Sequence, residues 1–242
     1  MNCKVMGIVN VTPDSFSDGG RYFRPEEAVR RVRNMIDEGA DIIDLGGEST
    51  RPGATPIGWE EEWRRLEPVL AALSAGPVPT SKGGPVPISV DTYHPETAER
   101  AVALGAGIVN CVFAESMPAM FDICAKSGAE LVIPAVSLGT VPMEGGTVPI
   151  YLDPMIGFGT TREEDLALLR AVPELAKKGR VLVGASRKRI VKKLTGEKVT
   201  GKNVGGNLAI AVWCAQHGAS VVRVHDVRET VQALRVMEAL EG

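Results

Sequence analysis

The sequence predicts an α/β fold, a single (β/α)8 TIM barrel with eight parallel strands that spans residues 1–242 as one domain. Short apolar runs alternate with amphipathic helical segments along the chain, eight such runs are present, and the length suits eight strand–helix units. Strands that are apolar on both faces are typical of parallel sheets covered by helices. Eight such units in about 250 residues favour a closed barrel over an open sheet.

Each expected strand is a short run rich in valine, isoleucine and leucine. The first reads CKVMGIV and the second DIIDL. In both runs apolar residues stand at odd and at even positions, so both faces of the strand are apolar. Runs of this length, bounded by glycine, proline or charged residues, indicate buried strands. We expect strands over 3–9, 41–45, 86–90, 108–113, 131–136, 150–153, 181–185 and 221–224.

The segments between these strands carry apolar residues three and four positions apart, as amphipathic helices do. Such spacing covers 25–39 and 60–73, where Trp63 and Leu66 lie on the apolar face. Pro95 suits the first turn of a helix, and Gly179 ends another. We expect the remaining helices over 95–104, 118–127, 163–178, 206–217 and 228–240.

One connection has no room for a helix. Residues 137–149 read SLGTVPMEGGTVP, and their glycines and prolines disfavour helix. We therefore expect eight strands and seven full outer helices, with outer helix five lost or reduced to a turn.

Composition excludes several other classes of protein. The 27 basic and 30 acidic residues give a net charge of −3, so no polybasic tail indicates a nucleic-acid or membrane partner. No apolar run reaches the roughly 18 residues of a membrane helix, and no signal pattern opens the chain. The four cysteines lack the spacing of a zinc site or a disulfide framework. We expect a cytoplasmic globular protein that binds neither nucleic acid nor membrane.

Polar residues gather where the expected strands end. Seven of the eight strands end in groups that can hydrogen-bond or carry charge, and only the fifth does not. Buried polar groups cost free energy unless they meet a ligand or one another, and barrel active sites lie at these ends. The residues are Asn10, 46–48, Asp91, Asn110, Asp153, 186–188, Arg223, His225 and Asp226.

Asp91, Asn110 and Asp153, with Lys188 nearby, offer acceptors and a donor to a flat heterocycle rich in N–H groups. A buried carboxylate that accepts two N–H bonds suits the edge of an aminopyrimidine. The alternative is that Asp91 caps the helix over 95–104 and Asp153 caps the turn that follows it.

A second group suits an anion. Arg51, Arg223 and His225 can bind phosphate or pyrophosphate, and Asn10 can contribute an oxygen to Mg²⁺, which pairs with substrate phosphates. The alternative is that Arg223 only pairs with Asp226 within the barrel mouth.

Two long polar loops complete the expected site. Residues 10–22 and 48–58 are rich in glycine, proline, serine and threonine, as mobile lids are. Phe16 lies in the middle of the first loop, where its ring could exclude water.

At these strand ends the chain resembles the dihydropteroate synthase family. The motifs, in order, are NVTPDSFSDGG from residue 10, DLGGESTRPG from 44, SVDTY from 89, DPMIGFG from 153, ASRK from 185 and RVHDV from 223. They span almost the whole chain, and the first two are highly specific. The resemblance implies a transferase that joins 6-hydroxymethyl-7,8-dihydropterin pyrophosphate to 4-aminobenzoate, giving 7,8-dihydropteroate and pyrophosphate, a step of folate biosynthesis.

The resemblance also implies a role for each site residue. Asp91, Asn110, Asp153 and Lys188 fall on the pterin pocket, and Asn10, Arg51, Arg223 and His225 fall on the pyrophosphate and Mg²⁺ site. Thr50, Pro52, Ser186 and Phe16 fall where 4-aminobenzoate is held. The implied mechanism is dissociative: pyrophosphate leaves first, and the amine captures a pterin methylene cation. Asp91, Arg51, Lys188 and Arg223 are the expected catalytic residues.

The chain also departs from the family pattern. The usual Asn-Asp pair after strand four is Asn110-Cys111, strand five lacks its usual histidine, and Thr160 replaces a lysine. Two other hypotheses therefore stay open: a pterin-dependent methyltransferase that uses methyl-tetrahydrofolate, and a non-catalytic pterin-binding homologue. The last two helices carry Trp213, Val231 and Met237, which suggests a homodimer.

Overall fold

The computed structural model describes residues 2–12, 24–49, 55–76, 83–139, 148–199 and 201–242. Its strands close into a parallel barrel in chain order, and β8 pairs with β1. The strands are β1 (Lys4–Asn10), β2 (Ile42–Gly46), β3 (Ile88–Asp91), β4 (Ile108–Asn110), β5 (Glu130–Pro134), β6 (Ile150–Asp153), β7 (Arg180–Val183) and β8 (Val221–Val224). The predicted (β/α)8 barrel is confirmed.

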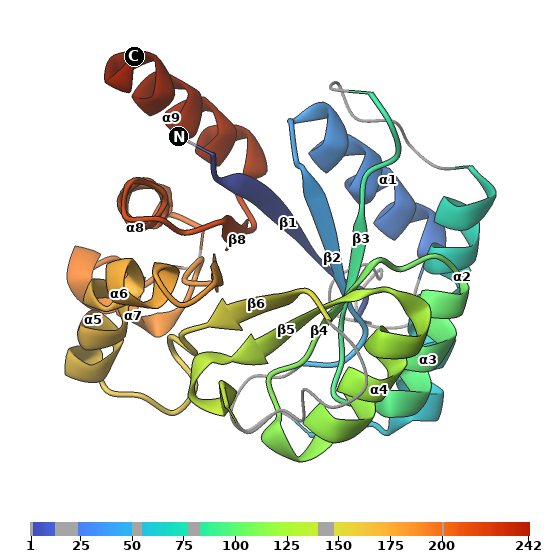
Figure 1. Ribbon diagram of the computed structural model, residues 1–242. Coiled ribbons are helices and arrows are strands. Elements are labelled where there is room, and N and C mark those ends of the chain that lie inside the picture. The colour runs from blue at the N-terminus through green and yellow to red at the C-terminus, as the bar shows by residue number, and fades with distance from the viewer. Residues whose placement is uncertain (1, 13–23, 50–54, 77–82, 140–147, 200) are drawn as a thin grey trace.

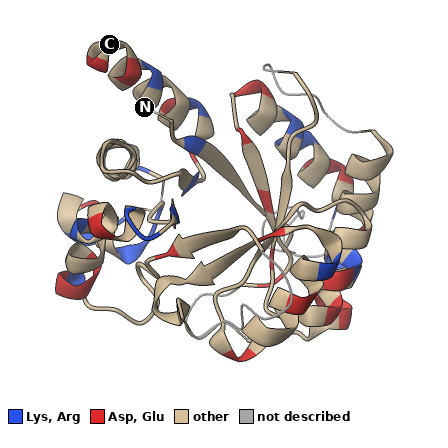
Figure 2. Cartoon of the chain, viewed as in Figure 1, with Lys and Arg blue, Asp and Glu red and all other residues tan. Residues whose placement is uncertain are grey.

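Helices surround the strands on the outside, and the start of β1 lies beside the last helix (Figure 1). They are α1 (Pro25–Asp37), α2 (Trp59–Ala75), α3 (Pro95–Ala103), α4 (Met117–Ser127), α5 (Arg162–Arg170), α6 (Val172–Ala176), α7 (Arg189–Thr195), α8 (Val204–Gln216) and α9 (Val227–Glu241). Short 3₁₀ turns, η1 (Ala114–Ser116) and η2 (Ala135–Ser137), follow β4 and β5. Basic and acidic residues are both spread over the outer helices (Figure 2), and no described helix is long and apolar enough to cross a membrane.

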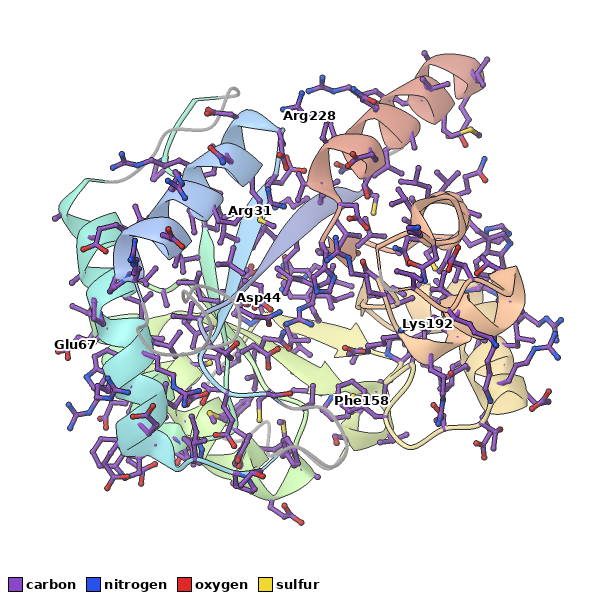
Figure 3. All side chains as sticks on the ribbon, turned by 180° about the vertical axis from the view of Figure 1, so that it is seen from behind. Arg31, Asp44, Glu67, Phe158, Lys192 and Arg228 are labelled. Carbon is purple, nitrogen blue, oxygen red and sulfur yellow. The ribbon has the colours of Figure 1, made fainter. Side chains whose placement is uncertain are left out.

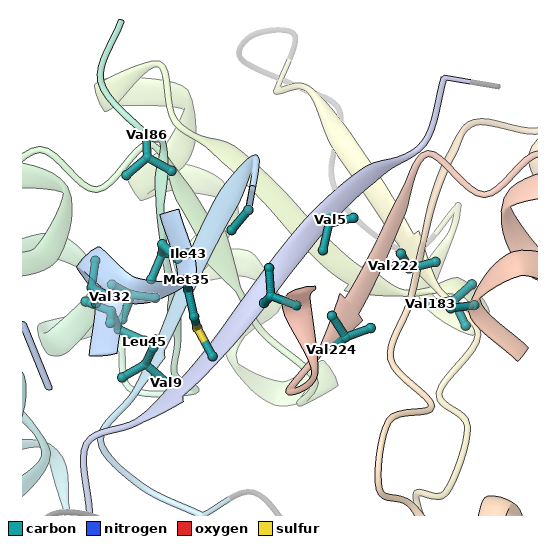
Figure 4. Packing of buried hydrophobic residues seen from close by; sticks show 14 of the residues in the cluster. Val5, Val9, Val32, Met35, Ile43, Leu45, Val86, Val183, Val222 and Val224 are labelled. Carbon is teal, nitrogen blue, oxygen red and sulfur yellow. The ribbon is translucent and has the colours of Figure 1, made fainter. Parts of the chain in front are cut away.

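The strands bury a different layer on each face. Inside the barrel, seven apolar side chains form a plug: Met6, Ile42, Ile108, Val132, Tyr151, Leu182 and Val221. Outside, the alternate residues pack against the helices (Figure 4). Ile43 and Leu45 lie on β2, on the side of α1, and Val222 and Val224 lie on β8, on the other side of β1. Burial of each such side chain contributes about 1.5–3 kcal/mol relative to exposure. Within the described residues, this plug fills the barrel on the amino-terminal side of the polar strand ends, so a ligand site is expected at the carboxyl ends of the strands.

Close packing of α1 on the first strand explains one glycine. A Cβ on Gly7 would lie 2.8 Å from Met35 Sδ and 3.1 Å from Val227 Cγ2. Met35 is fully buried between α1 and the sheet. A larger residue at position 7 would therefore require the buried side chains of Met35 and Val227 to move.

The single helix predicted over 163–178 was wrong. The structure contains two helices there, α5 and α6, that meet at Ala171. Pro173 has no N–H to donate to the turn before it, and its ring interferes with that turn. The separate helix α7 was not among the predicted outer helices. Strand β5 ends earlier than expected because η2 begins directly after it, and β4 ends at Asn110, before η1 begins at Ala114.

The connection between β5 and β6 agrees with the predicted loss of outer helix five. Its described residues hold only the 3₁₀ turn η2 and an extended stretch from Val148. Residues 140–147 lie outside the described residues. Val136 and Leu138, which belong to the described part of this connection, are exposed.

Candidate functional site

Strand register brings the predicted strand-end residues into one row. Asn10 is the partner of Gly46, Gly46 of Asp91, and Asp91 of Asn110. A Cβ on Gly46 would lie 3.7 Å from Asp91 Cβ and 3.9 Å from Asn10 Oδ1, so the glycine leaves space between two polar side chains. Three of the predicted residues therefore meet above the apolar plug, on neighbouring strands.

Arg223 forms the central ion pair of this site. Its Nε donates to Asp44 Oδ2 at 2.6 Å, and its Nη2 lies 2.5 Å from both Asp44 Oδ2 and Asp91 Oδ2. Asp44 is fully buried at the centre of the barrel (Figure 3). The alternative pairing of Arg223 with Asp226 is wrong, because Asp226 pairs with Arg187 instead.

Asp44 was missed by the sequence analysis as a site residue. It lies within the strand motif DIIDL, and a charged residue inside an otherwise apolar strand was the signal that could have identified it. Its Oδ2 also accepts a long 3.4 Å bond from Asn110 Nδ2. Asp44 thus connects the arginine to the amide of the neighbouring strand.

Several acceptors in this row lack partners within the described residues. They are Asp44 Oδ1, Asp91 Oδ1 and Asn110 Oδ1, each buried. A buried acceptor without a hydrogen bond is destabilising by about 1–3 kcal/mol, so such atoms point to a ligand that donates. The alternative that Asp91 caps α3 is wrong, since the residue at that cap is His94.

Asp153 and Lys188 form the opposite side of the site. Asp153 Oδ1 accepts from the N–H of Met155 at 2.7 Å, so the alternative of a turn cap is confirmed for this residue. Lys188 Nζ donates to the Ile156 carbonyl at 2.6 Å and lies 4.4 Å from the centre of the Phe158 ring. Phe158 stands on the loop after β6, at the edge of the barrel mouth (Figure 3).

Burial changes the proton affinity of these groups. It raises the pKa of Asp91 to about 7; the Arg223 guanidinium opposes this change and the Asp44 carboxylate reinforces it. Burial also raises the pKa of Asp153, against the effect of Lys188. Burial lowers the pKa of Lys188 to about 8, although Asp153 stabilises its charged form. The carboxyl group of Asp91, which lies among two other carboxyl groups and two cations, is therefore close to protonation near neutral pH.

Ser186 and His225 meet beside Arg223. Ser186 Oγ lies 3.2 Å from His225 Nδ1 and accepts a 3.3 Å bond from the His225 backbone N–H. The loops after β7 and β8 thus bring together two predicted site residues from distant segments. The other predicted residues, Phe16, Thr50, Arg51 and Pro52, lie outside the described residues.

A second polar cluster was not predicted. The Glu48 carboxylate accepts from Tyr93 Oη at 2.5 Å and from the Ile57 N–H at 3.3 Å, and lies 2.9 Å from His94 Nε2. It joins the end of β2 to the segment after β3. Glu48 follows β2 in the sequence, and Tyr93 and His94 follow β3. No local sequence pattern indicates that these residues pair with each other.

Comparison with known proteins gives consistent matches. The sequence profile of the pterin-binding enzyme family matches residues 6–147 and 145–225. The dihydropteroate synthase of Neisseria meningitidis serogroup B is 39% identical, over 98% of this chain and 92% of its own. The dihydropteroate synthase of Escherichia coli K12 is 36% identical, over 97% of this chain and 90% of its own.

Solved structures agree with the sequence matches. A Xanthomonas albilineans dihydropteroate synthase with 4-aminobenzoic acid superposes with a TM-score of 0.90 at 40% identity, covering 100% of this chain and 94% of its own. The same synthase in complex with 7,8-dihydropteroate gives 0.86 at 38% identity, with the same coverage. Names of these relatives favour the synthase hypothesis over a methyltransferase or a non-catalytic homologue.

Proposed function

The chain belongs to the pterin-binding family of dihydropteroate synthases, and we propose that it joins 6-hydroxymethyl-7,8-dihydropterin pyrophosphate to 4-aminobenzoate. The products are 7,8-dihydropteroate, for folate biosynthesis, and pyrophosphate. The observation that carries this proposal within the structure is the row of buried, unpartnered acceptors on Asp44, Asp91 and Asn110. A pterin presents N–H donors along one edge, which is the complementary pattern.

Pterin recognition rests on the carboxylates and the amide. Asp91 and Asn110 accept from the ring N–H groups on one side, while Asp153 accepts from the other side. Lys188, held over the Phe158 ring, donates to a ring acceptor. The Arg223 guanidinium keeps Asp91 in place through its 2.5 Å contact.

Pyrophosphate departure rests on the cationic and imidazole groups near β7 and β8. A guanidinium has five N–H groups, and Arg223 uses only Nε and Nη2 for Asp44 and Asp91. Its other N–H groups, together with Ser186 and His225, can meet phosphate oxygens. Arg51 contributes a further guanidinium.

Mg²⁺ is the proposed cofactor, with Asn10 as its protein ligand. Among the described residues no group of three or more His, Cys, Asp or Glu could cage a metal ion. Mg²⁺ does not require such a cage, because it keeps several waters and binds through one or two protein oxygens plus substrate phosphates. The half-buried Asn10 side chain, with Oδ1 close to Gly46 at the mouth, fits that role. When bound, the ion neutralises charge on the leaving pyrophosphate.

The chemical step needs no nucleophile from the protein. Burial raises the pKa of all four cysteine thiols to about 12, so none of them supplies a thiolate near neutral pH. The C–O bond to pyrophosphate breaks first, and the adjacent Asp91 carboxylate favours the resulting pterin methylene cation. The amine of 4-aminobenzoate, held by Thr50, Pro52, Ser186 and Phe16, then forms the C–N bond and loses a proton.

The test is pyrophosphate release from the pterin pyrophosphate, with 4-aminobenzoate and Mg²⁺ supplied. Release that requires both the amine and the metal, with formation of dihydropteroate, is the expected result. Methyl transfer from methyl-tetrahydrofolate without pyrophosphate release would instead identify a methyltransferase. Pterin binding with neither turnover would identify a non-catalytic homologue.

A cytoplasmic homodimer is a further part of the proposal. On α9, Val236 and Leu240 are 59% and 74% exposed and could form a subunit contact. Val231 cannot contribute, because it is buried in the core, and Trp213 stacks on His217, the residue that follows its helix, at 4.0 Å between ring centres. Sedimentation equilibrium of the wild type should give twice the mass of one chain, and Leu240→Glu should lower this value towards the mass of one chain. A wild type that already sediments with the mass of one chain would refute the contact.

A further inference from the structure

Three predicted site residues stand on the loops that follow β7 and β8. Past the ends of these two strands, no strand pairing connects the described residues of the loops. Ser186 and Lys188 follow β7, and His225 follows β8. For any of them to act on one ligand, the two loops must keep a constant separation. Ser186 and His225 bond to each other across the two loops, and a second set of residues, which does not face the ligand, joins the loops as well.

Arg187 lies between the two site residues of the first loop, in an unusual backbone conformation. Its φ is +59°, in the left-handed region that non-glycine residues rarely adopt. This conformation is destabilising by itself and persists only where surrounding contacts enforce it. Strain of this kind, at a residue between Ser186 and Lys188, indicates that the loop path is imposed by its neighbours.

Two contacts impose that path. The Arg187 backbone N–H donates to Asn207 Oδ1 at 3.1 Å, and its Nη2 donates to Asp226 Oδ1 at 2.5 Å. Asp226 directly follows His225 on the second loop. The ion pair therefore joins the loop after β7 to the loop after β8.

Asn207 completes a closed arrangement. It lies in the first turns of α8, only 6% exposed, and shares its buried face with Ala211, Cys214 and Ala215. While Oδ1 accepts from Arg187, Nδ2 donates to Asp226 Oδ2 at 3.2 Å. A buried amide on an apolar helix face is destabilising unless both its ends are bonded, and here both are.

We propose that Arg187, Asn207 and Asp226 are positioning residues that fix Ser186, Lys188 and His225 relative to one another for the transfer step. None of the three has to touch the substrate. Each acts through the neighbour that does: Arg187 through Ser186 and Lys188, Asp226 through His225. The proposal rests on the synthase function proposed above.

Two variants separate the contacts. Asn207→Ala removes both amide bonds, while Arg187→Asn removes the ion pair but keeps the backbone N–H, and asparagine tolerates a left-handed φ. Gln216→Ala is the matched control, since it deletes an exposed amide at the other end of α8 whose 3.1 Å contact is to Glu241. Arg187→Lys keeps the charge and should recover most of the loss caused by Arg187→Asn.

The readouts are kinetic and structural. Asn207→Ala and Arg187→Asn should lower kcat at least tenfold, while calorimetric affinity for 6-hydroxymethylpterin changes less than threefold. The reason is that three of the four residues assigned to the pterin, Asp91, Asn110 and Asp153, stand on other strands, so only the Lys188 contact is loosened. Amide hydrogen exchange over 185–189 and 224–227 should accelerate in both variants and stay unchanged in Gln216→Ala.

The proposed positioning role can fail separately from the proposed synthase function. If the wild type releases no pyrophosphate, the synthase function fails, and hydrogen exchange still decides whether the three residues couple the two loops. Unchanged exchange together with a kcat within twofold of wild type would overturn the proposal. So would an equal loss of kcat in Gln216→Ala, or no recovery in Arg187→Lys.

Discussion

Removal of Arg223 is the most severe single change that the site can undergo. Arg223→Met keeps a side chain of similar length but deletes every N–H, which leaves Asp44 and Asp91 without their cation. Asp44 is fully buried and Asp91 is 7% exposed, so neither carboxylate can turn to water. Breaking such a buried ion pair by removing one partner costs about 3–5 kcal/mol.

That free energy is large enough to measure directly. For a chain of this size each kcal/mol lowers the melting temperature by about 2–4 °C, so we expect a fall of about 6–20 °C. Urea unfolding followed by circular dichroism gives the free energy at 25 °C. A double-mutant cycle with Asp44→Asn should return a coupling of about 0.5–3 kcal/mol, because the second change removes one of the uncompensated charges.

The loss should depend on pH. Without Arg223 the folded-state pKa of Asp91 lies still further above the unfolded value of about 3.9. Between those two values the folded variant binds more protons than the unfolded chain, so its stability falls as the pH rises. Since the pKa of Asp91 is already about 7 with the arginine present, the gap to wild type should widen above pH 7. A variant within 1 kcal/mol of wild type at pH 8, or a cycle without coupling, would refute the reasoning.

Three further predictions follow from other contacts. Asp153→Asn should weaken pterin binding in calorimetry about 10- to 100-fold through loss of a charged acceptor, whereas exposed Asp122→Asn on α4 should not; equal affinities would contradict the pocket assignment. The pH profile of kcat/KM should rise through about pH 7 as Asp91 ionises and fall through about pH 8 as Lys188 loses its proton. Lys188→Arg should abolish the alkaline fall in any remaining activity. A flat wild-type profile from pH 6 to 9 would argue against both roles. Adjacent glycines of α8 should respond in opposite directions: Gly206→Ala places a Cβ 2.6 Å from Thr195 Cγ2 and should destabilise by about 1–3 kcal/mol, while Gly205→Ala meets no atom within 4 Å and should stabilise by about 0.5–1 kcal/mol. Equal melting temperatures for the two would show that the contact at Gly206 relaxes.

Much of the fold was predictable because its signals are local. Apolar runs such as DIIDL and CKVMGIV mark strands, and helical spacing marks the segments between them, whatever the rest of the chain does. The break at Pro173 was missed because the apolar spacing continues across it, while the backbone loses a donor there. The short helix α7 has too few residues for periodicity to stand out.

The sequence by itself determined the barrel, the family and the set of polar residues at the strand ends, since strand direction alone brings those ends to one mouth. Only the tertiary structure decided their partners. Arg223 meets Asp44 and Asp91 across separations of 179 and 132 residues, and Arg187 meets Asp226 while Asn207 bridges both. These pairings depend on register and on closure of β8 against β1. A strand-end carboxylate does not encode which of several cations it will meet, because that choice is made by the geometry of strands distant in the chain.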